Sequence, residues 1–247
     1  MMKKGVTTIA IIVGFFASLS IASEPRQSTE QPPTIELLTG SELTAVGGRV
    51  LTLFSHPQLP NKMWAGTEYA GLWQSIDSGS SWNQASVLMS NIAVTSIVAD
   101  PLNSDIIYVG TGDGRVSNTL LIGKGLFKSV DGGKNWNILE ATAPASAGER
   151  WGYIHSIAVS TEGVVLAATS DNKHNGYIYR SSDGGYSWSV EPVFTGSSVG
   201  PHNIIHKVRF DPDNPHIALF MDDYANVIHS IDGGVTWKTV KKSSTCQ

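Results

Sequence analysis

Four acidic positions recur in the chain, each just after a short apolar run that ends in or near Gly-Thr. They are Glu68, Asp113, Asp171, and Asp222 or Asp223. Acetal hydrolysis generally needs two carboxyl groups, about 5–5.5 Å apart for retention of configuration and roughly 6.5–9.5 Å apart for inversion. Adjacent loops can deliver such a pair, and Asp113 and Asp171 are our candidates for the catalytic acid and base.

Imidazole, aromatic and further charged side chains lie in the same or neighbouring segments and favour ligand binding. The predicted ligand-binding residues are Glu68, Arg115, Trp151, Tyr153, His155, His202 and Asp223, with Arg150, Asn203 and His206 close to them in sequence. Acids, imidazoles and aromatics that converge on one concave surface make a site for a sugar or a cation. The alternative is that these acids lie in solvated loops and cap their own turns.

The histidines do not have the spacing of a metal site. His155, His202 and His206 lack the tight ligand spacing of known zinc motifs. We therefore expect no metal, and no motif indicates a cofactor. Cys246 is the single cysteine, so the chain has no internal disulfide.

An eight-residue pattern occurs four times, with Ser first, Asp third, Gly fifth and Trp eighth. The copies read SIDSGSSW, SVDGGKNW, SSDGGYSW and SIDGGVTW, and they begin 54, 52 and 49 residues apart. Such a period is typical of repeat proteins. The Asp can accept hydrogen bonds from backbone N–H groups further along its turn, the Gly supplies a positive φ, and the Trp anchors one sheet on the next. We expect structural roles for Asp77, Trp82, Asp131, Trp136, Asp183, Trp188, Asp232 and Trp237.

Four short strands fit each repeat. First strands are predicted at residues 49–57, 94–101, 154–160 and 206–212, second strands at 63–67, 106–111, 164–169 and 216–221, a third enters each eight-residue pattern, and a fourth begins at its Trp. With no helical periodicity, this predicts an all-β propeller with one four-stranded antiparallel sheet per blade. Because strands alternate in direction, the second-to-third loops and the inter-blade connections share one side, which we call the loop face.

The number of blades raises the question of closure. Four recognisable blades are at the low end of the range of about four to eight. Residues 34–43 look like the outer strand of a blade that lacks its other strands, although the fourth repeat has its own outer strand at residues 237–240. We expect an incomplete or open propeller, and an exposed blade face would tend to self-associate.

The loop at residues 112–125 is the longest on the loop face. It carries Leu120, Leu121 and Ile122 in a row. A lid or partner-binding role and a hairpin extension packed on its own blade both fit this sequence.

The N-terminus reads as a targeting segment. Residues 1–22 fit a signal peptide, residues 23–33 a flexible leader, and residues 34–247 the propeller domain. Removing Lys3 and Lys4 takes the formal charge from −4 to −6. Because nucleic acids are bound by positively charged surfaces, we expect no nucleic-acid partner for an exported, acidic protein. We expect a secreted or periplasmic protein with no membrane association after cleavage.

The repeats resemble a known family. The eight-residue patterns, the G-T…G-L-[WF]-x-S elements before them and the D-P-x-[ND]-x-x-I turns are similar to Asp-box (bacterial neuraminidase repeat) propellers over about residues 34–240. That superfamily includes sialidases, xyloglucan-active glycosidases, sortilin-type receptors and a photosystem II assembly factor. The resemblance therefore implies the fold and leaves the function open.

The catalytic elements of the enzymes in this family are not matched. No Arg-Ile-Pro occurs, and Arg180 lies in a third strand beside an eight-residue pattern, so Arg150, Arg180 and Arg209 do not support a sialidase triad. Where the xyloglucan-active enzymes carry Asp-x-Gly-Gly-x-x-Arg-Trp, this chain has Ser55-His56-Pro57. We favour a secreted, non-catalytic propeller that binds a glycan or an extracellular protein. The alternative is a sialidase- or xyloglucanase-like glycoside hydrolase, or a truncated remnant of one.

Overall fold

The computed structural model describes residues 49–114, 121–144, 149–189, 192, 194–195 and 204–240. The chain divides into two compact units, Met1–Pro33 and Thr34–Gln247, and every described residue belongs to the second. The predicted signal peptide, leader and extra outer strand at residues 34–43 lie outside the described residues.

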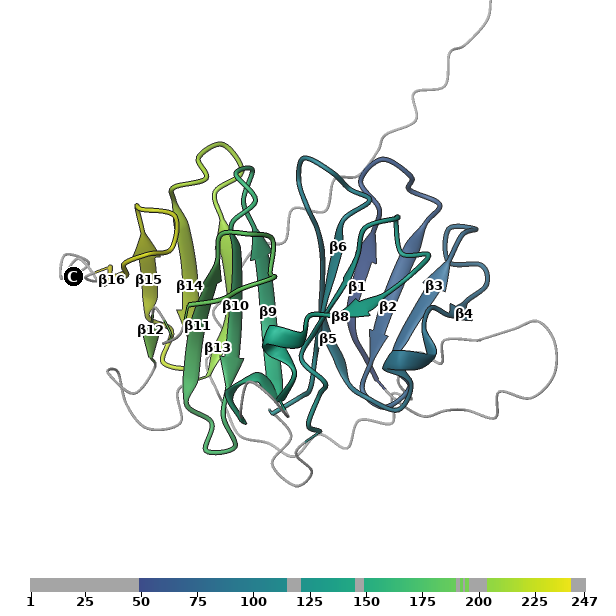
Figure 1. Ribbon diagram of the computed structural model, residues 1–247, viewed down its shortest axis with the longest axis horizontal. Helices are drawn as coiled ribbons and strands as arrows, with labels where there is room; N and C mark the ends of the chain where they lie inside the picture. Colours follow the sequence, from purple (N-terminus) through teal and green to yellow (C-terminus); the bar gives the residue numbers. More distant parts are fainter. Residues whose placement is uncertain are drawn as a thin grey trace, which may run out of the picture. The chain divides into compact units, whose positions relative to one another are not determined.

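The described residues form four separate four-stranded antiparallel sheets (Figure 1). The first two sheets contain β1 (Val50–Ser55), β2 (Met63–Thr67), β3 (Leu72–Ser75), β4 (Asn83–Gln84), β5 (Val94–Ala99), β6 (Ile107–Thr111), β7 (Leu126–Ser129) and β8 (Asn137–Ile138). The other two contain β9 (Tyr153–Val159), β10 (Val165–Ser170), β11 (Gly176–Ser181), β12 (Phe194–Thr195), β13 (Ile205–Phe210), β14 (Ala218–Asp222), β15 (Val227–Ser230) and β16 (Lys238–Thr239). Each sheet is one predicted blade, and the all-β fold is confirmed.

Short 3-10 turns occur among the described residues. They include η1 (Val87–Met89), η2 (Glu140–Thr142) and η3 (Glu149–Trp151), which lie in the connections between blades. Among the described residues, no helix has the length and apolar character needed to cross a membrane.

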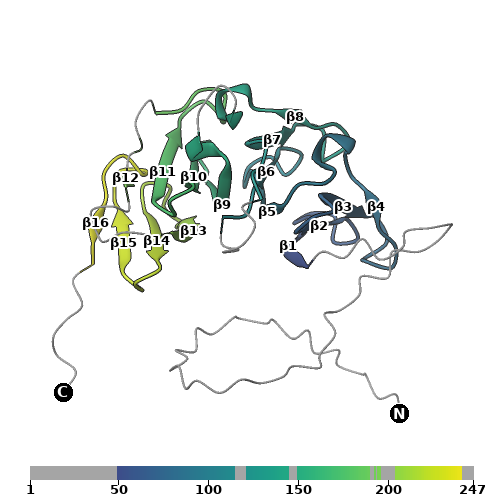
Figure 2. The same ribbon diagram turned by 90° about the horizontal axis from the view of Figure 1, so that it is seen from below.

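The blades pack face to face in chain order, with the first strands β1, β5, β9 and β13 next to one another along the inside (Figure 2). The middle strands of the second and third blades carry apolar side chains on both faces, so these two blades contribute to the core on either side of them. Three clusters fill the three joints between blades: one around Trp64 and Phe127, one around Tyr108 and Trp151, and one around Leu166 and Phe220.

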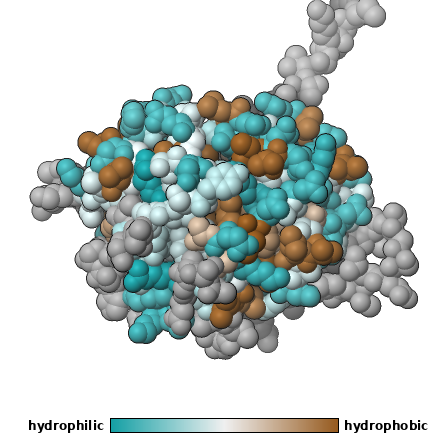
Figure 3. All heavy atoms as spheres, viewed as in Figure 1, coloured by the Kyte–Doolittle hydropathy of each residue, from teal (hydrophilic) through white to brown (hydrophobic). Residues whose placement is uncertain are grey.

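The first and fourth blades lie at the two ends of this row (Figure 2). Within the described residues the propeller is incomplete, as expected. On the side of the molecule in Figure 3, exposed apolar residues form small groups among polar ones.

The fourth strands differ from the sequence expectation. None includes its Trp, and β12 begins six residues after Trp188. In that blade Ser189 N–H donates to the Arg180 carbonyl at 2.9 Å, and the strand pairing resumes only at Ile178–Phe194. In the first and third blades the Trp closes the turn before the strand starts, because its indole N–H donates to the carbonyl of Gly79 at 3.1 Å and of Gly185 at 2.9 Å, respectively.

The eight-residue turns are closed by the same hydrogen bonds in all four blades. In the second, Ser129 Oγ donates to Asp131 Oδ1 at 2.8 Å and accepts from Gly133 N–H at 2.8 Å, while Asn135 donates its backbone N–H to Asp131 Oδ1 at 2.9 Å and its side-chain amide to Oδ2 at 2.6 Å. The seventh residue of each pattern, a partner of the Asp, varies among Ser, Asn and Thr and gave no sequence signal. The carboxylates are acceptors within their own turns, which is the contact pattern of a turn-closing residue.

The second, third and fourth turns also contact the blade before them. A Cβ on Gly133, Gly185 or Gly234 would lie 2.6–2.8 Å from Trp64, Leu139 or Leu166 of the preceding blade. The fourth-position carbonyl accepts a side-chain hydrogen bond from that same blade, for example from Lys128 Nζ to Gly184 O at 2.9 Å. The turns are therefore part of the joints between blades.

Candidate functional site

The loop face is built as expected from the second-to-third loops and the inter-blade connections. Gly123 in the second-blade loop donates its N–H to the Gly152 carbonyl, just before β9, at 2.8 Å. Lys124 Nζ donates to the Leu88 carbonyl in η1 at 3.0 Å. These contacts bring together residues that are far apart in the sequence.

Every first strand has a β-bulge near its start on this side. The register of pairing shifts at Leu51, Thr95, His155 and His206, one residue in each blade. Bulges turn a side chain out of the regular alternation and are common next to functional sites. The third and fourth blades, which are neighbours, both place a histidine there.

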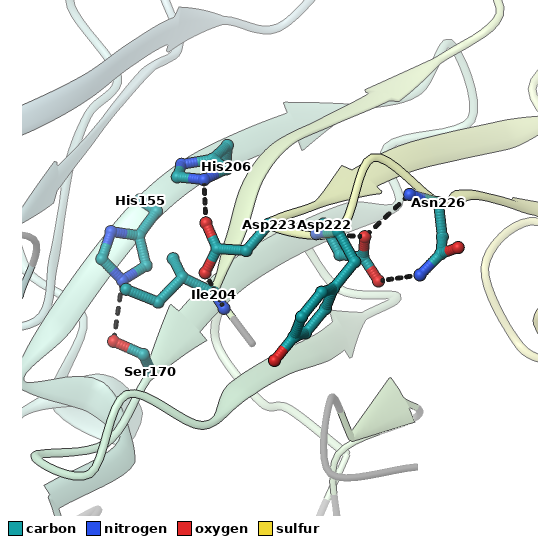
Figure 4. Close-up of polar contacts among 8 residues, drawn as sticks. His155, Ser170, Ile204, His206, Asp222, Asp223 and Asn226 are labelled. Atoms are coloured by element: carbon teal, nitrogen blue, oxygen red, sulfur yellow. Dashed lines mark hydrogen bonds and ion pairs between the residues drawn. The ribbon is translucent and has the colours of Figure 1, made fainter. Parts of the chain in front are cut away.

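His206 and Asp223 form the exposed pair of the site (Figure 4). His206 Nε2 contacts Asp223 Oδ1, and Asp223 Oδ2 accepts the Ile204 N–H at 2.7 Å. The side chains are 48% and 32% exposed, respectively. The carboxylate thereby joins the loop between β14 and β15 to the start of β13 and orients an imidazole that remains open to solvent.

His155 and Ser170 form a buried pair beside it (Figure 4). His155 Nε2 and Ser170 Oγ are 2.7 Å apart, and both residues are buried. Ser170 was not among the sequence candidates. Its position at the end of β10, opposite the bulged start of β9, is a tertiary feature that no local motif indicates.

Asp171 closes its own loop. It accepts hydrogen bonds from the backbone N–H groups of Lys173 and Asn175 at 2.9 Å, the Asn175 amide at 3.0 Å and the Tyr177 hydroxyl at 2.8 Å. Burial opposes its ionisation, but these hydrogen bonds outweigh burial and hold its pKa below the ordinary value. Asp222 caps the corresponding loop of the fourth blade in the same way. The catalytic role predicted for Asp171 remains a prediction, and its contacts match the capping alternative.

Asp113 and Glu68 are buried carboxylates. Asp113 is 1% exposed and pairs through its backbone with Leu121, while Ile122 next to it is exposed. Glu68 forms a bidentate ion pair with Arg49, in which both N–O distances are 3.1 Å. The two carboxylates lie in the first two blades, apart from the pair formed by His206.

Trp151 and Tyr153, predicted to bind ligand, belong instead to the core. Trp151 is 3% exposed, and its ring centroid lies 4.7 Å from that of Tyr179 and 5.0 Å from that of Trp188. The connection before β9 turns these rings inward, where burial of a large aromatic surface stabilises the joint. Arg115 and His202, also predicted, lie outside the described residues.

Two exposed tyrosines on the loop face were missed. Tyr69 follows Glu68 and Tyr224 follows Asp223, at corresponding positions of the first and fourth blades, and they are 41% and 51% exposed. The sequence signal that could have revealed them is an acidic residue followed directly by Tyr at the same point of two repeats. Exposed aromatic rings next to polar groups are typical of ligand-binding surfaces.

Among the described residues, no group of three or more His, Cys, Asp or Glu side chains is placed to hold a metal ion.

Comparisons with known proteins connect the chain to carbohydrate enzymes. No family model matches it. It is 26% identical over 239 residues to a probable oligoxyloglucan-reducing end-specific xyloglucanase of Neosartorya fischeri, an alignment that covers 77% of this chain and 27% of the relative. The chain thus spans about a quarter of the length of that curated relative.

Solved structures show the same fold. An ancestral GH74 enzyme matches with a TM-score of 0.62 at 21% identity, covering 83% of this chain and 26% of that one. The GH74 xyloglucanase of Xanthomonas campestris matches with a TM-score of 0.54 at 19% identity, covering 76% and 29%. These similarities show the propeller fold of the described residues.

Proposed function

We propose that this protein is an exported, hydrolase-like propeller that binds a xyloglucan-type polysaccharide on its loop face. The observation that carries the proposal is the cluster of His206, Asp223 and Tyr224 on the fourth blade. A solvent-exposed imidazole, held by a carboxylate, lies in the same loop region as an exposed aromatic ring. Export rests on residues 1–22, and N-terminal sequencing of the mature protein, expected to begin at Ser23, tests it.

The chemistry of this cluster suits sugar hydroxyls. With Nε2 engaged by Asp223, His206 keeps Nδ1 for a second hydrogen bond, as an acceptor when the ring is neutral and as a donor when it is protonated. A sugar hydroxyl can serve either form. The Tyr224 ring offers an apolar surface for the C–H face of a pyranose, and its phenol can bond to a hydroxyl.

Binding of xyloglucan oligosaccharide by calorimetry tests this function. We expect His206→Ala and Tyr224→Ala each to weaken the Kd by about tenfold, the loss of roughly 1.4 kcal/mol. Tyr186→Ala is the matched control, because Tyr186 is also exposed but lies in an eight-residue turn on the opposite side. Equal affinity of the wild type and both loop-face variants would place the binding elsewhere.

Hydrolysis of the same polysaccharide is the second candidate. The similarity to xyloglucanases supports this hydrolase-like alternative better than a role unrelated to carbohydrate enzymes. Two carboxyl groups are required, and the hydrogen bonds that lower the pKa of Asp171 suit a base better than an acid. Release of sugars that disappears in Asp113→Asn or Asp171→Asn would establish hydrolysis. Binding without release would leave the protein as a binding module.

A further inference from the structure

The fourth blade has one face that packs on the third blade and one that faces away from it. Val208, Phe220 and Ile228 are buried on the first face. The pairing register places Arg209, Leu219, His229 and Lys238 in one row across the other face, with Lys207 and Val227 in the next row. We call this second face the cationic face. Leu219 is 43% exposed on it.

This face differs from the faces that form the joints between blades. In the other blades, the residues equivalent to Arg209 are apolar: Phe54, Val98 and Ala158. The residues equivalent to Lys207 carry hydroxyl groups: Thr52, Ser96 and Ser156. The hydroxyls of Ser96 and Ser156 accept hydrogen bonds from Ile157 N–H at 3.1 Å and Val208 N–H at 3.3 Å, which are groups of the next first strand.

Lys207 cannot take this role, because an ammonium group has no acceptor. His229 lies at the third-strand position that corresponds to Lys128 and Arg180. Those two side chains donate hydrogen bonds to the eight-residue turn of the next blade. Another blade packed here would nevertheless bury Lys207 and Arg209 without counter-charges, which is costly. On the side of the first blade that faces away from the second, Ala65 and Trp73 are buried and Leu53 is exposed. These strand positions are apolar, so a second copy docked end to end would not neutralise the cations with them.

The cations of this face are not neutralised within the described part of the chain. The cations Lys207, Arg209 and Lys238 have no side-chain hydrogen bond or ion pair there, and neither does the imidazole of His229. Partial withdrawal from water and the neighbouring Arg209 lower the pKa of Lys207, and no carboxylate counteracts this effect. A ligand with negative charge would be attracted to this face.

We infer that the cationic face binds an acidic polypeptide segment that also carries aliphatic side chains. Leu219 and Val227 lie on the two middle strands, with Lys207 and Arg209 on the edge strand β13 and Lys238 on the edge strand β16. An apolar centre with a charged rim is the usual arrangement of a protein interface. A sugar acid or a sulfated polysaccharide has no aliphatic side chain to cover Leu219 and Val227.

The size of the face fits a segment of chain. With strands about 4.8 Å apart and about 3.3 Å per residue, the face measures roughly 15 Å by 20 Å. The area of the face is therefore well below the area of about 800 Å² that each partner buries in a standard interface between globular proteins.

Fluorescence anisotropy with a labelled peptide of alternating glutamate and leucine tests this inference on the mature protein. We expect binding that weakens at least tenfold when glutamine replaces glutamate in the peptide, and that weakens similarly for Lys207→Gln/Arg209→Gln. Leu219→Asn should weaken it several-fold and provides a second variant if the double variant is unstable. Lys134→Gln removes an exposed cation from an eight-residue turn and should leave the affinity unchanged.

Three results would overturn the inference. One is equal affinity for the glutamate and glutamine peptides. Another is equally tight binding of dextran sulfate, which would indicate attraction for any polyanion. The third is a concentration-dependent dimer, seen by sedimentation and lost in the double variant, because a second copy would then be the occupant. The xyloglucan assays are unaffected by each of these results, so the two proposals fail independently.

Discussion

Ser78 occupies a backbone conformation that glycine adopts in the three other turns. Its φ is +62°, and the corresponding residues Gly132, Gly184 and Gly233 have φ of +69°, +70° and +68°. A residue with Cβ is disfavoured in this left-handed region by roughly 1–2 kcal/mol. The first turn therefore stores strain that the other three avoid, although its hydrogen bonds are the same.

At the residue scale we predict that Ser78→Gly stabilises the protein. Relief of this strain, offset by the greater freedom of glycine in the unfolded chain, should raise the free energy of unfolding by about 0.5–1 kcal/mol. Urea denaturation measures the change. Ser182→Gly, at the second position of the third turn, where φ is not positive, is the control and should not stabilise. A lower stability of Ser78→Gly would contradict the strain argument.

At the element scale, the joint between blades depends on contacts from one blade to the turn of the next. Gly133 lies against the indole of buried Trp64, and an added Cβ would be 2.6 Å from its Cζ2 atom. Gly79 holds the same position in the first blade, where an added Cβ would find its nearest neighbour at 3.7 Å. Both glycines have positive φ, +80° and +89°, so alanine strains the backbone at both.

The difference in stability between Gly133→Ala and Gly79→Ala measures the contribution of the contact between the turn and the preceding blade. We expect Gly133→Ala to cost about 1–3 kcal/mol more, the usual penalty for overpacking. Thermal or urea unfolding of the two variants measures the difference. Equal losses would mean that Trp64 moves aside freely and that the turn does not contribute to the joint.

Elements and their order were predictable because their determinants are local. The Ser-x-Asp turns and alternating strands specify each blade within a few residues, and all four blades form. The roles of Trp151 and Asp171 were not predictable in this way, since burial of a ring or capping of a loop depends on what packs there. The pairing of His155 with Ser170 depends on a bulge in one strand and the end of another, which no spacing in the sequence reveals.

At the scale of the whole molecule, the four turn aspartates couple stability to pH. Hydrogen bonds from their turns lower the pKa values of Asp77 and Asp131 to about 2. For Asp183 and Asp232 burial acts in the opposite direction, but the hydrogen bonds outweigh it and the pKa values are again about 2. Because the folded pKa lies below the unfolded value of about 3.9, folding favours the ionised form. The stabilisation is present above pH 4 and is lost as the pH falls towards 2.

We therefore predict a steep loss of stability between pH 4 and pH 2. The free energy of unfolding, measured by urea titration through this range, should fall less steeply in Asp183→Asn, which has one such group fewer. Lys134→Gln is the control and should keep the slope of the wild type. Identical slopes in wild type and Asp183→Asn would show that this carboxylate has the same pKa in the folded and unfolded chain.

Binding of xyloglucan on the loop face is the central claim, and histidine side-chain NMR tests it most directly. His206 and His155 lie on that face, whereas His56 and His216 lie in the first-to-second strand loops on the opposite side. Titration with xyloglucan oligosaccharide should shift the ring resonances of His206 most, shift those of His155 less, and leave those of His56 and His216 in place. Shifts confined to His56 and His216, or no shift at saturating ligand, would contradict the account.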